Sequence, residues 1–75
     1  MNRKDALRRL NGLAPQVEAH LDKIESTPTS RDVPHWKKEI GAWLNQMERI
    51  VPDVGDKTAA EWQAKIDGWK TRLGL

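Results

Sequence analysis

The first 25 residues carry apolar side chains at intervals of three or four, which is the spacing of one face of an α-helix. They are Ala6, Leu10, Ala14, Val17, Leu21 and Ile24. Pro15 lies inside this pattern, and a proline removes one backbone hydrogen bond and clashes with the preceding turn. The pattern therefore predicts a helix over residues 3–25 that either kinks near Gly12–Pro15 or breaks there into two helices. Because the apolar spacing keeps its phase across Pro15, we favour a kinked or nearly continuous helix.

A cluster of turn-forming residues follows, from Ser26 to Asp32, and predicts a loop. Asp32 has the short acceptor side chain of a helix N-cap, and Pro34 fits the first turn of a helix. Pro52 ends the next helix, because the residue before a proline avoids helical backbone angles. The apolar stripe between these prolines predicts a helix over residues 33–51 and consists of Trp36, Ile40, Trp43, Leu44, Met47, Ile50 and Val51.

Thr58 and Glu61 have the spacing of a capping box, in which each side chain bonds the backbone N–H of the other residue. This motif predicts that a third helix begins after Thr58 and covers residues 59–73. Gly74 follows directly, as suits a residue that closes a helix in the left-handed conformation. The apolar stripe of this helix is Ala59, Trp62, Ile66, Trp69 and Leu73.

Three amphipathic helices joined by short turns predict an all-α fold, a small antiparallel three-helix bundle. The alternative is a pair of helices that completes its core by dimerisation. No segment alternates apolar and polar residues as a half-buried strand does. At this length we expect one helical domain over residues 1–75, either as a monomer or as a homodimer.

The aromatic residues are four tryptophans, with no phenylalanine or tyrosine, and cysteine is also absent. Without cysteine the chain has no disulfide, no thiolate zinc site and no cysteine nucleophile. A domain of this size without such cross-links is stabilised by packing, so the tryptophans predict a tryptophan-rich core. Two tryptophan pairs share one spacing around an isoleucine, which fits ordinary helical periodicity or a duplicated helix: Trp36, Ile40 and Trp43, then Trp62, Ile66 and Trp69.

Charge is unevenly distributed along the chain, although the formal net charge is only +2. Residues 1–15 carry four basic residues against one acidic residue. Residues 16–56 carry five basic against eight acidic residues, and residues 57–75 carry four against two. In an antiparallel bundle, two basic ends and an acidic middle can neutralise one another.

The basic residues of the first helix are a separate case. Arg3, Lys4, Arg8 and Arg9 lie near the helix N-terminus, where positive charge opposes the helix dipole. Asp5 lies one turn before Arg9 and offsets one of these charges as an i,i+4 pair. Helix stability does not explain the remaining charges, whereas an anionic partner would.

The histidines and carboxylates show no spacing typical of a catalytic or metal site. His20 and His35 lie on different predicted elements, so no single helix presents both imidazoles to a metal ion. Carboxylates such as Glu18 and Asp22 lie on polar faces, without the burial that prepares an acid or base for catalysis. We therefore expect no enzyme activity, no metal site and no cofactor.

The chain has no segment typical of membrane insertion or secretion. No apolar run approaches the length of about 20 residues that a membrane span requires. Residues 1–13 begin with basic residues but lack the apolar segment of a secretory signal. We expect a cytoplasmic protein that does not enter membranes.

The remaining candidates for function are surface residues that a partner would contact. Trp36 is the tryptophan we expect to be most exposed, because it begins the second helix beside His35. Trp69, beside Lys70, is the second such candidate. Together with the basic group, the predicted partner-binding residues are Arg3, Lys4, Arg8, Arg9, His35, Trp36, Trp69 and Lys70.

We expect a small non-enzymatic helical module that works through protein–protein interaction, as an adaptor, an inhibitor, or an immunity or anti-defence type of protein. This expectation follows from the small size, the missing catalytic groups, the surplus of tryptophan and the segregated charge. The alternative is a nucleic-acid-binding accessory protein that uses basic N- and C-terminal patches.

Overall fold

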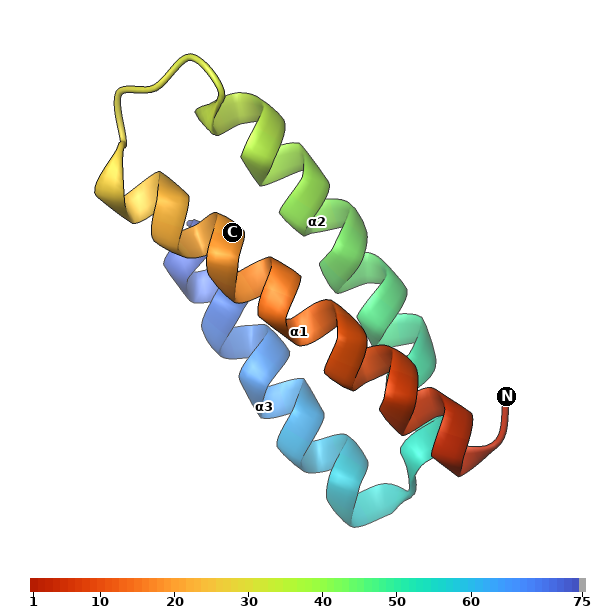
Figure 1. Ribbon diagram of the computed structural model, residues 1–75. Helices are drawn as coiled ribbons and strands as arrows, with labels where there is room; N and C mark the ends of the chain where they lie inside the picture. Colours follow the sequence, from red (N-terminus) through yellow and green to blue (C-terminus); the bar gives the residue numbers. More distant parts are fainter. Residues whose placement is uncertain (75) are drawn as a thin grey trace.

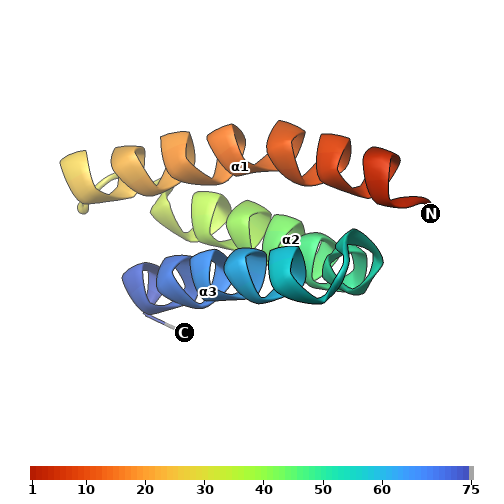
Figure 2. The same ribbon diagram turned by 90° about the horizontal axis from the view of Figure 1, so that it is seen from below.

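The computed structural model describes residues 1–74 as three α-helices and one short 3-10 helix. The α-helices are α1 (Arg3–Ser26), α2 (Val33–Ile50) and α3 (Asp56–Leu73), and the 3-10 helix η1 (Val51–Val54) joins α2 to α3. Successive helices run in opposite directions, and α1 lies across the pair formed by α2 and α3 (Figure 1 and Figure 2). The predicted all-α three-helix bundle is confirmed.

Helix α1 is one continuous helix of 24 residues, although it contains Pro15. At its start the Asn2 side chain accepts a hydrogen bond from the Asp5 backbone N–H at 2.8 Å and caps the helix. Asn11 and Pro15 are both exposed. The proline ring nitrogen has no hydrogen to donate to the Asn11 carbonyl, so the helix continues without that one backbone hydrogen bond. The alternative of two separate helices is therefore wrong.

Helix α2 begins after Asp32, with Pro34 in its first turn, as predicted. Asp32 has helical backbone angles and its side chain caps no N–H, so the position is right and the capping interaction is absent. The helix ends at Ile50, one residue before the predicted end. Pro52 then lies within η1, whose tighter turn carries the chain toward α3.

Helix α3 begins at Asp56, three residues before the predicted start. Gly55 precedes it with a φ of 89°, a left-handed value that suits glycine, and the Gly55 carbonyl accepts from the Ala59 N–H at 2.7 Å. Thr58 is already inside the first turn and lacks the extended backbone of an N-cap residue, so the predicted capping box is wrong. Gly74 closes the helix with a φ of 84°, as predicted.

One apolar core runs through the bundle and takes residues from every element. The predicted stripes supply most of it, and Val54 of η1, which the sequence placed in a turn, is buried as well. Removal of these side chains from water is the main stabilising contribution. The buried residues are Ala6, Leu10, Val17, Leu21, Ile40, Leu44, Met47, Ile50, Val51, Val54, Trp62, Ile66, Trp69 and Leu73.

Candidate interaction surface

Four exposed basic residues stand together on the first two turns of α1. We call them the α1 basic patch: Arg3, Lys4, Arg8 and Arg9. None of the ion pairs within residues 1–74 involves a member of the patch. The predicted pair between Asp5 and Arg9 is therefore wrong, and Asp5 instead accepts a hydrogen bond from the Asn2 side chain at 3.1 Å.

Arg3 is the member of the α1 basic patch that the bundle itself positions. Its guanidinium lies against Gly55, where an added Cβ atom would come within 2.8 Å of Nη2. Glycine at this junction thus provides both the left-handed backbone and the room for the arginine. The patch still places positive charge at the N-terminal end of a helix, where the dipole disfavours it, so the fold alone does not account for it.

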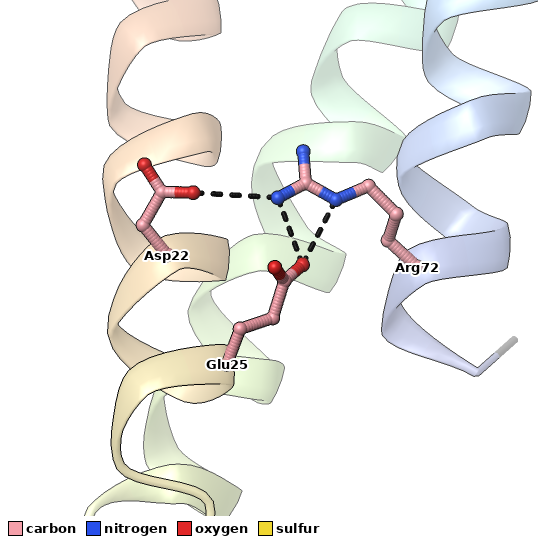
Figure 3. Close-up of polar contacts among 3 residues, drawn as sticks. All are labelled: Asp22, Glu25 and Arg72. Carbon is pink, nitrogen blue, oxygen red and sulfur yellow. Dashed lines mark hydrogen bonds and ion pairs between the residues drawn. The ribbon is translucent and has the colours of Figure 1, made fainter.

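The basic residues near the end of α3 are bound inside the bundle. Lys70 Nζ lies 2.6 Å from Glu48 Oε1 of α2. Arg72 reaches two carboxylates of α1, with Nη2 2.8 Å from Glu25 Oε1 and 3.3 Å from Asp22 Oδ1 (Figure 3). Hydrogen bonding to Glu25, with a smaller effect of Asp22, raises the pKa of Arg72 above its ordinary value. Neutralisation of basic residues by the acidic middle is thus confirmed at this end of the chain.

The four tryptophans divide by helix. Trp62 and Trp69 of α3 are buried, at 6% and 5% exposed, while Trp36 and Trp43 of α2 are half-buried. The expected exposure of Trp69 is wrong, because the rotation of α3 turns this indole into the core. Trp36 keeps the partial exposure that we expected, and Lys23 of α1 places its Nζ 5.9 Å from the Trp36 ring centroid.

The predicted partner-binding residues do not form one site. The α1 basic patch lies at the N-terminal end of α1, whereas His35 and Trp36 lie in the first turn of α2, at the opposite end of the bundle (Figure 1). Trp69 belongs to the core, and Lys70 belongs to a contact between two helices. Of the predicted partner-binding residues, those of the α1 basic patch are the ones that combine exposure, proximity and one sign of charge.

A polar contact between α1 and α2 was not predicted. His20 Nε2 of α1 lies 3.2 Å from Glu39 Oε2 of α2, and His35 Nε2 lies 2.6 Å from the other oxygen of the same carboxylate. The His20 ring also meets the Trp43 indole at 90°, with ring centroids 4.8 Å apart. The four-residue spacing of His35 and Glu39 was a usable signal, whereas the His20 contact depends on how two helices align.

Residues 1–74 contain no pocket and no group of three or more His, Cys, Asp or Glu side chains that could hold a metal ion. Of the helices in this part of the chain, none is both long and apolar enough to cross a membrane. No known protein family, curated protein or solved structure matches the chain.

Proposed function

We propose that this protein is a small non-enzymatic binding module that docks its α1 basic patch onto an acidic segment of a protein partner in the cytoplasm. One observation carries the proposal: four exposed cations stand on the first two turns of α1, and the ion pairs of residues 1–74 leave all four out. Lys70 and Arg72 provide the contrast, since both bind carboxylates of the bundle. Such a surface would serve an adaptor, an inhibitor, or an immunity or anti-defence protein.

An acidic protein segment fits the patch for two physical reasons. Carboxylates near the first turns of α1 interact favourably with the positive end of the helix dipole. They also offset the repulsion between that end of the dipole and the basic side chains of the patch. The guanidinium groups of Arg8 and Arg9 are planar and match carboxylates in bidentate geometry. Charge complementarity of this kind speeds association and selects partners more than it adds raw affinity.

The alternative, a nucleic-acid-binding accessory protein, has less support. Strong duplex binders neutralise on the order of 6–10 phosphates, whereas the patch holds four cations. Lys70 and Arg72, two of the four basic residues in residues 57–75, are already bound to carboxylates. Trp36 lies at the far end of the bundle, so this half-buried indole is not available to stack on bases beside the patch.

We also propose that the module acts as a monomer, in preference to a homodimer. Among residues 1–74, Met1 is the one large hydrophobic side chain that is exposed. Stable homodimers bury a contiguous apolar area, whereas Met1 is a single side chain.

Arg8 and Arg9 test the proposal, with Lys37 and Lys38 as the matched control. Both pairs are adjacent, exposed and outside the ion pairs of the described residues. Proteins retained from a lysate are compared for the unchanged chain, Arg8→Gln/Arg9→Gln and Lys37→Gln/Lys38→Gln, with and without nuclease. We expect a protein partner that survives nuclease, is released by salt, and is retained about tenfold less by the Arg8/Arg9 variant alone.

Two outcomes would contradict this function. If the two double variants retained the partner equally, the α1 basic patch would not be its binding surface. Loss of all retained material after nuclease would favour the nucleic-acid alternative instead. Urea denaturation should place the free energies of unfolding of both variants within about 0.5 kcal/mol of the unchanged protein, which separates lost binding from lost folding.

A further inference from the structure

The charged group of Arg3 lies against a defined part of the bundle. A Cβ atom added at Gly55 would lie 2.8 Å from Arg3 Nη2, 3.1 Å from Cζ and 3.3 Å from Nε. Because these three atoms are almost equally distant, the guanidinium lies broadside against the glycine and does not point one edge at it. The flat face of the group therefore rests on the junction between η1 and α3, in space that a side chain at position 55 would occupy.

The hydrogen-bond donors of Arg3 point away from this contact. A guanidinium is planar and carries its N–H groups in that plane, so a group that lies broadside directs them along the surface beneath it. Asp53 and Asp56 flank Gly55 in the chain, yet no side-chain hydrogen bond or ion pair between described residues involves Arg3. Arg3 is also exposed. Its donors are therefore oriented, accessible and not used by the bundle.

The other residues of the α1 basic patch differ from Arg3 in this respect. Lys4, Arg8 and Arg9 are exposed, and no hydrogen bond, ion pair or cation–π contact between described residues fixes their side chains. A long side chain that moves freely in solution loses rotational freedom when it binds a partner. Arg3 already has a defined orientation, so it loses less of this freedom on binding.

We propose that Arg3 is the specificity-determining residue of the α1 basic patch and binds one carboxylate of the partner's acidic segment in bidentate geometry. This inference rests on the proposed function, since it concerns how the same patch selects its partner. Two parallel N–H···O bonds from one guanidinium require a planar acceptor with two oxygens, which a carboxylate provides. The acidic segment therefore reaches from α1 to the η1–α3 junction, with an Asp or Glu side chain at Arg3. The other three cations contribute attraction at longer range.

The orientation of Arg3 is tested in the free protein. Relaxation of the ¹⁵N nuclei in the arginine Nε–Hε groups measures how much each guanidinium moves on the picosecond-to-nanosecond timescale. We expect a higher order parameter for Arg3 than for Arg8 and Arg9. Equal order parameters for the three arginines would overturn the proposal, because the contact with Gly55 would then not hold the group.

Arg3→Lys and Arg9→Lys are a matched pair for binding, because each keeps the charge of an exposed α1 residue and removes its planar group. The probe is a synthetic oligoglutamate peptide, titrated at low salt, with oligoglutamine as the uncharged control. We expect Arg3→Lys to raise the dissociation constant about fivefold and Arg9→Lys to raise it less than about twofold. Urea denaturation should give both variants the same midpoint, which separates lost binding from lost folding.

Arg8→Gln/Arg9→Gln, the variant that tests the proposed function, separates the two conclusions. Suppose that the unchanged chain binds oligoglutamate, that this double variant binds it more weakly, and that Arg3→Lys and Arg9→Lys behave alike. The proposed function then stands and the role given to Arg3 is wrong. If the unchanged chain binds oligoglutamate no better than oligoglutamine, both proposals fail.

Discussion

The two halves of α1 bury the same kind of apolar stripe but use their charged residues differently. Residues 3–14 contain the α1 basic patch, and no ion pair between described residues involves it. Residues 15–26 are joined to α3 through Arg72 (Figure 3). They are joined to α2 through the contact of His20 with Glu39. Polar and charged side chains of residues 15–26 contact the neighbouring helices. The basic side chains of residues 3–14 are exposed and outside the ion pairs of the described residues.

This difference separates what holds the fold together from what is open to a partner. Exposed ion pairs contribute about 0–1 kcal/mol each, so the second half gains alignment from its pairs more than stability. The apolar stripe, present in both halves, supplies most of the stabilisation. Apolar packing therefore holds the first half in place, and its basic side chains form no ion pairs with the described residues. A docking surface requires this combination of a fixed backbone and unpaired charges.

The largest effects should come from the core and should be equal in the two halves. Leu10 and Leu21 are 0% and 1% exposed, one in each half. Replacing either with alanine should lower the free energy of unfolding by about 2–5 kcal/mol, because each substitution leaves a cavity. Urea denaturation measures both losses. A loss at Leu10 of less than half the loss at Leu21 would break the comparison, since it would reveal looser packing under the basic patch.

A smaller gain is expected at the junction of the two halves. Pro15→Ala should raise the free energy of unfolding by about 1–2 kcal/mol, because alanine restores an N–H for the Asn11 carbonyl and removes the ring clash. The gain stays below the full effect of a mid-helix proline, since proline also restricts the unfolded chain. Thermal unfolding measures it, with Gln16→Ala as an exposed control. A loss of stability would mean that the proline ring helps to join the halves.

The smallest effects should distinguish bound from unbound charges. A double-mutant cycle of Arg72→Gln and Glu25→Gln should give a coupling of about 0.5–1 kcal/mol at low salt, and less at high salt, because the groups are exposed. Arg8→Gln should change the free energy of unfolding by only a few tenths of a kcal/mol, about the size of one charge near a helix terminus. Greater destabilisation by Arg8→Gln than by Arg72→Gln would show that the fold uses Arg8.

The helices followed from the sequence because the residues that define each stripe lie on one helix and need no knowledge of its neighbours. The continuous α1 shows the strength of this signal, since its apolar phase outweighed Pro15. The start of α3 shows its limit. With Gly55 at a positive φ, α3 begins at Asp56, three residues earlier than the Thr58–Glu61 motif predicts. The motif contains no information about that backbone angle.

The candidate surface was predictable only where neighbouring residues share one helix. The exposure of Lys4, Arg8 and Arg9 follows from their place outside the apolar stripe, whereas the position of Arg3 against Gly55 depends on how α1 meets η1 and α3. The burial of Trp69 and the contact of Lys70 with Glu48 depend on the rotation of α3, and the contact of His20 depends on the alignment of α1 with α2. These rotations are set by many side chains at once, because the ridges of one helix surface pack into the grooves of the next. The sequence of one helix alone does not give them.

The division of the tryptophans between α2 and α3 gives the chain a fluorescence signal that reports on two helices separately. The indoles of α3 are enclosed, at 6% and 5% exposed, and those of α2 are partly open to water. A dissolved quencher should therefore reduce the fluorescence of the α2 indoles first, and the remaining emission should come from the indoles of α3. If α3 separates from its neighbours, the fluorescence of its two indoles should become accessible to the quencher as well. This measurement needs no dye attached to the protein.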